Sequence, residues 1–436
     1  MKRYALVGTG SRATMFIDPL VTTYRDQGEL VALCDSNPTR LDYYNERLEG
    51  ELGYHRVPTY SASDFDEMVR ETKPDTIIVT TIDAFHHEYV IRAMELGCDA
   101  ITEKPMTVDD QKCRAILDTV ERTGRDLRVT FNSRWSPGTT MLRKVLQEGV
   151  IGDVLHVDME YLLDTSHGAD FFRRWHREKK NSGGLLVHKA THHFDLVNWW
   201  LDAVPETVFG WGKLAFYGRE NAEQRGMKVE YERYSGQDIS DDPFAIDVSA
   251  DERLKRLYYD AEQHDGYQRD RNVFGDGITI EDTNSLLVKY GTGTFLNYSL
   301  NAYLPREGFN VVFNGTKGRI EYDEEHASGV VPGQKRDREH DWMRKLRVLP
   351  MFGEPYEVDI PLGEGGHGGA DPLIQEQVFS DNPPEELLGR NAGGQQGAAS
   401  IMVGISANRS YETGLPVRVA DLCPQIGDAV HLSELV

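Results

Sequence analysis

The 436-residue sequence predicts an α/β protein in two parts, an N-terminal doubly wound parallel sheet and a C-terminal α+β domain with a largely antiparallel open sheet. Up to residue 130, short β-branched runs alternate with helical stretches, the order typical of parallel strands joined by crossover helices. These runs are YALVG, ELVALCD, DTIIVTT, DAITEKP and DLRVTFN. From residue 131, runs such as VLHVDMEYLL, SLLVKY, TFLNYSL and FNVVFNG alternate apolar and polar residues, which predicts antiparallel strands with one buried face. The expected domains are therefore 1–130 and 131–436.

Three segments of the second domain depart from this alternation. Residues 219–277 are polar and rich in Tyr and Asp, and we interpret them as an insertion with local structure of its own. The glycine-rich GEGGHGGAD at 363–371 predicts a loop, and residues 393–412 predict a helix of small residues that Gly414 and Pro416 end. The insertion and the glycine loop either fold over a substrate pocket or serve solubility alone.

Composition excludes several classes of partner. The chain has 48 basic and 71 acidic residues, and its net charge of -23 repels phosphate backbones and anionic lipid headgroups, so we expect no nucleic acid and no membrane as partner. The opening MKRYALVGTG leaves no room for the apolar core of a signal peptide. The four cysteines lie far apart without a CxxC pair, as is typical of reduced thiols, and predict a cytoplasmic protein.

A glycine-rich turn directly follows the first predicted strand. Gly8-Thr9-Gly10-Ser11-Arg12-Ala13 has the form GxGxxA between a strand and a helix, the context in which that form binds a dinucleotide. The first glycine permits the tight turn, the second lets the backbone approach a pyrophosphate, and the alanine keeps the helix close to the strand. This pattern predicts a Rossmann domain.

Asp35 strengthens this prediction because it ends the second predicted strand, 25 residues after Gly10. A carboxylate there can accept hydrogen bonds from both ribose hydroxyls, and it repels a 2'-phosphate. No Arg follows at once in Asp35-Ser36-Asn37-Pro38, so NAD is favoured over NADP. The alternative is a doubly wound domain that binds no nucleotide.

Glu103-Lys104-Pro105 follows the fourth predicted strand at its carboxyl end, where open parallel sheets bind their ligands. A lysine ammonium held there can donate a proton or a hydrogen bond to a substrate oxygen, and burial lowers its pKa toward a useful range. The alternative is a surface lysine in a turn that Pro105 fixes.

A histidine cluster lies in SGGLLVHKATHHFD, residues 182–195. If the segment is one helix, His188, His192 and Asp195 stand at i, i+4 and i+7 and share a face. Two histidines at this spacing with a carboxylate also fit zinc, but no HExxH pattern accompanies them, and a purely structural pair is the third possibility. We expect no metal here.

Together these motifs resemble the Gfo/Idh/MocA family, the group of glucose-fructose oxidoreductase and inositol dehydrogenase. The resemblance rests on GTGSRA, Asp35, the TID segment before His86, EKP and GGLLVHKATHHFD, in that order. It covers the first 200 residues well and the following sheet more loosely. Its most specific part is EKP combined with the nucleotide fingerprint.

The resemblance implies roles for two residues. In the family, the lysine of EKP and the last histidine of a DxxxH motif lie beside the nicotinamide and handle the proton of the substrate hydroxyl, which assigns catalysis to Lys104 and His192. The chain departs at the family's aspartate position, which holds His188, and at Asp83, where many members have asparagine. A neutral imidazole at 188 can bond a sugar hydroxyl but adds no negative charge.

The fingerprint and the resemblance together give two sets of expected site residues. The expected cofactor contacts are Gly8, Gly10, Ser11, Arg12, Ala13, Asp35, Thr81, Asp83, His86 and Glu103. The expected substrate contacts are His188, His193, Arg134, Arg174, Trp175 and Asp195.

The sequence thus predicts a cytoplasmic, NAD-dependent oxidoreductase that moves a hydride to or from a hydroxyl-bearing carbon of a sugar, glycoside or cyclitol. One alternative is an NAD-dependent glycosidase, which oxidises a hydroxyl transiently, eliminates the aglycone, adds water and reduces the ring again. Another is a non-catalytic dinucleotide-binding regulatory protein. An exposed face of the second sheet and the resemblance both favour a homo-oligomer, dimer or tetramer.

Overall fold

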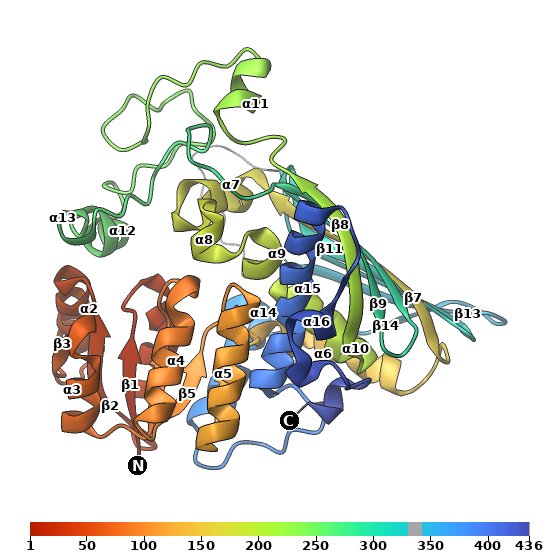
Figure 1. Ribbon diagram of the computed structural model, residues 1–436, viewed down its shortest axis with the longest axis horizontal. Coiled ribbons are helices and arrows are strands. Elements are labelled where there is room, and N and C mark those ends of the chain that lie inside the picture. The colour runs from red at the N-terminus through yellow and green to blue at the C-terminus, as the bar shows by residue number, and fades with distance from the viewer. Residues whose placement is uncertain (330–341, 436) are drawn as a thin grey trace.

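The computed structural model describes residues 1–329 and 342–435 and confirms the predicted fold class. A parallel sheet with helices on both faces comes first, and a larger sheet lies beside it (Figure 1). Among the described residues, no helix is both long and apolar enough to cross a membrane. All four cysteines are free and buried.

The first sheet has the strand order β15-β6-β5-β4-β1-β2-β3, and all its pairings are parallel except that of β15 with β6. The strands are β1 (Lys2–Val7), β2 (Gly28–Asp35), β3 (Thr59–Ser61), β4 (Thr76–Val79), β5 (Asp99–Thr102), β6 (Leu127–Val129) and β15 (Ala392–Gly393). The covering helices are α1 (Thr14–Val21), α2 (Pro38–Gly50), α3 (Phe65–Thr72), α4 (His86–Glu95) and α5 (Asp110–Thr123). The five predicted strands are present, and buried apolar runs such as TIIV in β4 explain their central position.

The second sheet has nine strands in the order β14-β13-β12-β11-β7-β10-β9-β8-β16. Its pairings are antiparallel except between β7 and β10. The strands are β7 (Val154–Asp164), β8 (Pro205–Lys213), β9 (Thr283–Tyr290), β10 (Phe295–Leu304), β11 (Arg306–Gly315), β12 (Gly318–Ser328), β13 (Met343–Pro350), β14 (Tyr356–Val358) and β16 (Val417–Arg418).

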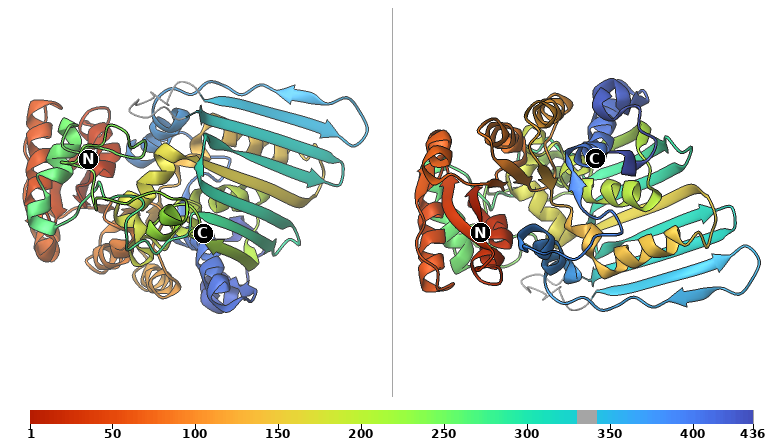
Figure 2. Two further views of the ribbon diagram at one scale, coloured as in Figure 1. Left: turned by 90° about the horizontal axis from the view of Figure 1, so that it is seen from above. Right: turned by 90° about the horizontal axis from the view of Figure 1, so that it is seen from below.

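Helices cover one face of this second sheet, and the opposite face is open in the view from above (Figure 2). They include α6 (Pro137–Gln147), α7 (Thr165–Arg173), α9 (Leu185–His188), α10 (Thr191–Leu201), α15 (Gly394–Thr413) and α16 (Val419–Leu422). Helix α8 (Lys179–Ser182) packs on α9, and α14 (Gly366–Phe379) packs on α1 of the first domain and on α6. Helix α15 confirms the predicted helix of small residues and ends at Gly414, whose φ is 69°. Small residues let α15 pack closely, since a Cβ at Gly404 would lie 2.4 Å from the Leu186 carbonyl oxygen.

One local expectation differs from the structure. The single helix expected through 182–195 is two helices, because the chain breaks at Lys189 and Ala190 between α9 and α10. His192 N–H donates to the Lys189 carbonyl rather than to the His188 carbonyl, which leaves the latter for a side chain. The glycine loop at 363–371 holds left-handed residues at His367, Gly368 and Gly369, and a regular helix follows it.

The insertion runs from residue 214 to 282, between β8 and β9, and so begins and ends close to the predicted limits of 219 and 277. It contains the short helices α11 (Arg219–Gln224), α12 (Glu252–Leu254) and α13 (Glu262–Asp265). In Figure 1, α12 and α13 lie directly over α2 and β3. The insertion therefore leaves the second domain and covers one end of the first sheet.

Candidate active site

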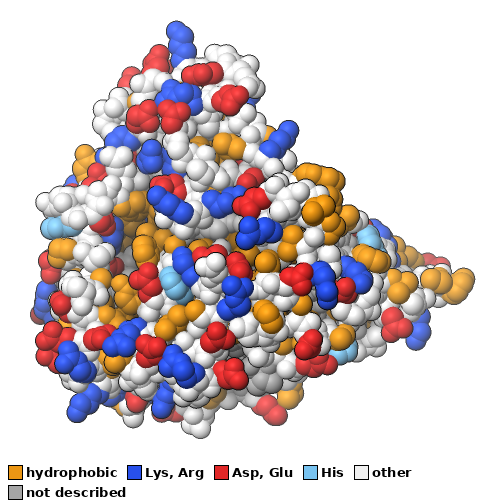
Figure 3. Space-filling view, viewed as in Figure 1, with side chains coloured by type: hydrophobic (Ala, Val, Ile, Leu, Met, Phe, Trp, Pro, Cys, Tyr) orange, Lys and Arg blue, Asp and Glu red, His pale blue; other side chains and the backbone are white. Residues whose placement is uncertain are grey.

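A cavity of about 1240 Å³ lies between the two domains. Its walls are the loops after β1, β2, β4 and β5, the α9–α10 segment, strands β11 and β12, and part of the insertion. The carboxyl ends of parallel strands open into it, which is the place where open α/β sheets bind ligands. On the face shown in Figure 3, acidic and basic side chains are interspersed around this region.

The turn after β1 has the shape of a dinucleotide cradle. Gly8 has a φ of 95°, and a Cβ there would lie 2.5 Å from the Thr81 amide nitrogen, so only glycine fits. Gly10 lines the cavity, and Ala13 is fully buried against the sheet rather than facing the cavity. These observations fit a nicotinamide dinucleotide, with open backbone at the second glycine and close helix packing at the alanine.

Asp35 is held in one orientation at the edge of the cavity. Its Oδ2 accepts hydrogen bonds from the Thr9 amide at 2.6 Å and the Thr9 hydroxyl at 2.9 Å, and its Oδ1 accepts one from the Asn37 amide at 2.8 Å. Both lone pairs of Oδ2 are thus used, and Oδ1 has one left for a ribose hydroxyl. Arg40 lies 3.7 Å from Asp35 but makes a shorter ion pair, 2.7 Å, with Asp265 of the insertion.

Glu103 and His86 fix the loop that carries Lys104. The Glu103 carboxylate accepts from the Thr130 hydroxyl at 3.1 Å and pairs with Arg12 at 2.9 Å. The two ring nitrogens of His86 lie 2.8 Å from the Pro105 carbonyl and 3.1 Å from the Thr81 carbonyl. His86 therefore joins the loop after β4 to the loop after β5.

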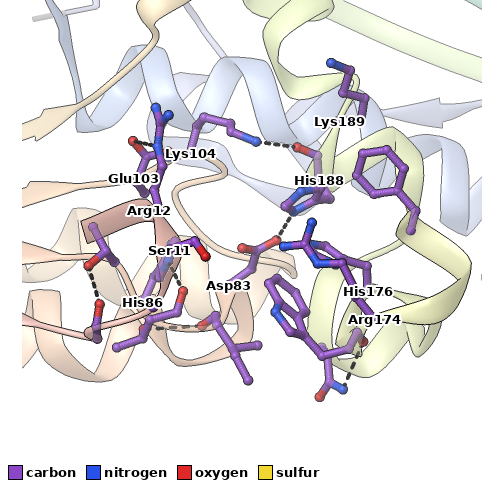
Figure 4. Close-up of a pocket in the computed structure, with 18 of the residues that line it drawn as sticks. Ser11, Arg12, Asp83, His86, Glu103, Lys104, Arg174, His176, His188 and Lys189 are labelled. Atoms are coloured by element: carbon purple, nitrogen blue, oxygen red, sulfur yellow. Dashed lines mark hydrogen bonds and ion pairs between the residues drawn. The ribbon is translucent and has the colours of Figure 1, made fainter. Parts of the chain in front are cut away.

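Lys104 extends from the first domain into the cavity and donates to the His188 carbonyl at 3.4 Å (Figure 4). Burial lowers the pKa of Lys104 to about 8, against the opposing effect of Glu103 and Asp83. The break between α9 and α10 makes this contact possible, since it frees that carbonyl. Lys104 is charged at pH 7 and can give up a proton at modest cost.

Asp83 and His188 form the shortest polar contact in this part of the cavity. Asp83 Oδ2 lies 2.5 Å from His188 Nδ1, and Figure 4 shows the carboxyl aimed at that ring. Burial raises the pKa of Asp83 well above its ordinary value, and burial together with the Lys104 charge lowers the pKa of His188 well below its own. Burial thus favours the uncharged form of both groups.

His192 lines the cavity at the start of α10. Its Nδ1 lies 3.2 Å from the Ser133 hydroxyl, which orients the ring and leaves Nε2 available to a ligand. Burial, with the charges of Lys104 and Lys189, lowers the pKa of His192 well below its ordinary value. Its imidazole is therefore neutral at pH 7 and can accept a proton.

Three other expected substrate contacts also line the cavity. His193 Nδ1 lies 2.7 Å from the Tyr298 hydroxyl, and its ring stacks on Tyr161 with 3.7 Å between centroids. Arg174 and Trp175 approach from the end of α7, and Trp175 stacks on His176 at 3.6 Å. His176 was not predicted as a site residue, although it directly follows the predicted Arg174 and Trp175 in the sequence.

The structure places Arg134 and Asp195 away from the cavity, which corrects the expectation that they bind substrate. The two side chains pair with each other at 2.6 and 2.8 Å and are 0% and 1% exposed. Arg134 also donates to the Gly389 carbonyl and to Gln396. Because α10 begins as a separate helix at Thr191, Asp195 does not share a helix face with His188, and its side chain binds Arg134 instead.

Sequence reasoning missed the far wall of the cavity, which strands β11 and β12 supply. Glu307 lies 2.6 Å from the His167 ring, and Glu324 binds His326 at 2.8 Å and Arg344 at 2.9 Å. The two glutamates are only 4% and 3% exposed. The sequence did hold a signal for Glu324. Alternate residues of a strand share a face, so Glu324 lies on the same face as the buried Ile320 and Tyr322.

The glycine loop and the insertion complete the walls. His367 lines the cavity and lies 2.7 Å from Asp371, which also accepts from Asn132 at 2.9 Å. The insertion contributes Tyr258 and residues 265–268. Among the described residues, no group of three or more His, Cys, Asp or Glu side chains is arranged to hold a metal ion.

Two family profiles match nearly the whole chain. Residues 2–131 match the NAD-binding Rossmann fold of the GFO_IDH_MocA oxidoreductase family, and residues 143–419 match its C-terminal alpha/beta domain. These limits agree with the two sheets of the structure.

Three curated relatives indicate the range of activities among similar proteins. A putative oxidoreductase, YteT of Bacillus subtilis, is 35% identical over 97% of this chain and 99% of its own length. Glycosyl hydrolase family 109 protein 2 of Akkermansia muciniphila is 23% identical over 96% of this chain and 82% of its own. D-glucoside 3-dehydrogenase of Escherichia coli is 30% identical over 44% of this chain and 52% of its own.

Proposed function

Because the chain belongs to the Gfo/Idh/MocA oxidoreductase family, we propose that it transfers a hydride between NAD and a hydroxyl-bearing carbon of a sugar, glycoside or cyclitol. One observation carries the proposal. The Lys104 ammonium and the neutral His192 imidazole line the same cavity as the glycine turn and Asp35. When bound, the nicotinamide supplies the hydride acceptor, and the protein supplies orientation and a proton path.

The cofactor we propose is NAD rather than NADP. Asp35 presents a fixed carboxylate where a ribose hydroxyl can bind, and a 2'-phosphate would meet its negative charge. Arg40, the nearest cation, is engaged by Asp265 at 2.7 Å and so is not free to pair with a phosphate.

His192 accepts the hydroxyl proton in the proposed oxidation, and Lys104 binds the same oxygen. Its lowered pKa keeps the His192 imidazole unprotonated at neutral pH, so that its ring nitrogen is free to accept a proton. The Lys104 ammonium stabilises the negative charge that develops on the oxygen as the proton leaves. The other expected contacts, His188, His193, Arg174 and Trp175, line the space that a sugar would fill.

The test is a screen of sugars, glycosides and cyclitols with NAD, in which NADH absorbance and released aglycone are followed together. With a confirmed substrate, Lys104→Met should lower kcat by about a thousandfold, since a positioned donor to a developing oxyanion contributes about 10²–10³. Lys112→Met is the matched control, because Lys112 lies on α5 and bonds the Ala84 carbonyl and Asp109. Full activity of Lys104→Met would refute the assigned role.

A second candidate is an NAD-dependent glycosidase with no net redox change. The match to a glycosyl hydrolase family 109 protein over 96% of this chain favours it. The Asp83–His188 pair and the nearby His193 offer further proton donors and acceptors for elimination and water addition. Release of aglycone without accumulation of NADH would select this candidate, and NADH accumulating in step with substrate would exclude it.

We also propose a cytoplasmic, homo-oligomeric protein. Four free, buried cysteines support a reducing compartment. Large apolar side chains on the open face of the second sheet support assembly of copies through that face; Trp211, Leu287 and Phe295 are 67%, 54% and 53% exposed.

A further inference from the structure

The insertion makes a continuous series of polar contacts with the dinucleotide side of the first domain. They begin at the glycine turn, cross the loop after β2 and end on α2. A segment that served solubility alone would not need such contacts. The residues that the insertion contacts all belong to one region, the dinucleotide cradle.

Tyr258 makes the contact nearest the glycines. Its hydroxyl accepts a hydrogen bond from the Ser11 amide at 2.8 Å and donates one to the Ser11 side chain at 2.9 Å. Ser11 directly follows Gly10, at the part of the fingerprint whose backbone faces a pyrophosphate. The Tyr258 ring is 7% exposed and lines the cavity.

Arg269 holds this phenol in place. Its guanidinium stacks on the Tyr258 ring, 4.3 Å from the centroid. Burial acts to raise the pKa of Tyr258, but Arg269 and the Ser11 hydrogen bonds outweigh burial and bring that pKa below its ordinary value. A more acidic phenol is a stronger hydrogen-bond donor to an anion.

Beyond Tyr258, the insertion contacts the loop after β2 and the start of α2, where the adenosine part of the dinucleotide is expected to bind. The Asn37 side chain donates to the Ala261 carbonyl and to Asp265, both at 2.9 Å. Arg40 donates to the Leu257 carbonyl at 3.1 Å and pairs with Asp265. Asn37 and Arg40 both lie next to Oδ1 of Asp35, so the insertion abuts the residues expected around the ribose.

We propose that the insertion is a second wall of the dinucleotide site, in which Tyr258 donates a hydrogen bond to the pyrophosphate and the contacts to Asn37 and Arg40 retain the cofactor between turnovers. This inference rests on the proposed NAD-dependent function. On binding, the phenolic proton turns from the Ser11 hydroxyl to a phosphate oxygen, while the oxygen keeps accepting from the Ser11 amide. Arg269 is a positioning residue that acts through the ring.

The consequence is slow cofactor release, because the insertion must separate from the cradle before the dinucleotide can leave. Tyr258→Phe keeps the ring and its Arg269 contact but removes the phosphate donor, so we expect NADH to leave about tenfold faster. Arg256→Ala removes the ion pair with Glu46 and the contact with the Tyr43 ring, at the far end of the contact series. Release should then rise about threefold.

The experiment loads the full chain with NADH, displaces it with excess NAD and follows the loss of NADH fluorescence by stopped flow. Tyr259→Phe is the matched control, because the neighbouring Tyr259 is 39% exposed and faces Arg233 instead of the cradle. Its release rate should equal that of the natural chain. Thermal melting confirms that each variant is folded.

The outcomes separate this inference from the proposed function. Faster release in Tyr258→Phe and Arg256→Ala, with Tyr259→Phe unchanged, supports the second wall. If NADH binds but leaves at the same rate from all variants, the inference is wrong and the proposed oxidoreductase function stands. A folded chain that binds neither NADH nor NADPH overturns both.

Discussion

At the scale of residues, two departures from the family pattern are in contact with each other. His188 occupies the position of the family's aspartate, and Asp83 stands where asparagine is common, yet their side chains meet at 2.5 Å. A carboxyl group is therefore still present at this point of the cavity, contributed by the first domain instead of α9. Because burial favours the neutral form of both groups, the pair adds little net charge beside Lys104.

The same burial sets the expected pH dependence of sugar oxidation. Activity requires a neutral His192 and a charged Lys104. Since the pKa of His192 is lowered, activity persists below pH 6.5, and since the pKa of Lys104 is about 8, kcat/KM should fall as pH rises through about 8. The measurement is kcat/KM from pH 5 to 10 with a confirmed substrate. If kcat/KM instead rises through pH 8, Lys104 is the proton acceptor and the two roles are exchanged.

At the scale of elements, the break between α9 and α10 decides which side chains reach the cavity. A continuous helix would bring His188, His192 and Asp195 to one face, whereas the break turns Asp195 into the core and frees the His188 carbonyl for Lys104. The buried pair of Asp195 with Arg134 then ties α10 to the loop after β6. Its role in the structure is to position α10, the helix that carries His192.

This reassignment predicts a stability effect without an effect on substrate binding. Asp195→Asn leaves the Arg134 charge buried without its ionic partner, which should lower the free energy of unfolding by about 3 kcal/mol. Urea unfolding measures the change, and KM of the folded variant should stay within about twofold of the natural value. Asp66→Asn, which breaks an exposed pair with Arg92, should shift the urea midpoint far less. A large rise in KM for Asp195→Asn would restore Asp195 as a substrate contact.

At the scale of the whole molecule, the second sheet has two different faces. Gly212 in β8 faces α15, since a Cβ there would lie 2.4 Å from the Tyr411 ring, so the adjacent Trp211 faces away from the helices. Trp211 and its apolar neighbours on β9 and β10 then lie on the open face seen in Figure 2. A face of this kind is usually covered by a partner, and a second copy of the chain is the partner that we propose.

The corresponding prediction concerns assembly. The natural chain should be a dimer or tetramer at micromolar concentration in light scattering, and Trp211→Glu should raise the dissociation constant by about a hundredfold, because a charge would be buried at the centre of the contact. Trp211→Phe, which keeps an apolar ring, is the control. A natural chain that is monomeric at high concentration would contradict the assignment of this face.

The sequence by itself determined the elements whose signals are local. The glycine turn, Asp35 and the loop of Lys104 each follow a buried strand directly, and a parallel sheet brings the carboxyl ends of its strands together, so their meeting could be predicted. The two sheets and the α15 helix were predicted for the same reason, since periodicity and capping are read over a few neighbouring residues.

Only the tertiary structure decided the rest. It brought Glu307, Glu324 and His367 to the far wall, laid Tyr258 of the insertion on the glycine turn, and paired Asp83 with His188 across 105 positions of chain. It also showed that Arg134 and Asp195 bond each other instead of a ligand. The physical reason is that such contacts depend on how separately folded elements pack, and a local pattern can mark a residue as buried without showing which distant segment it meets.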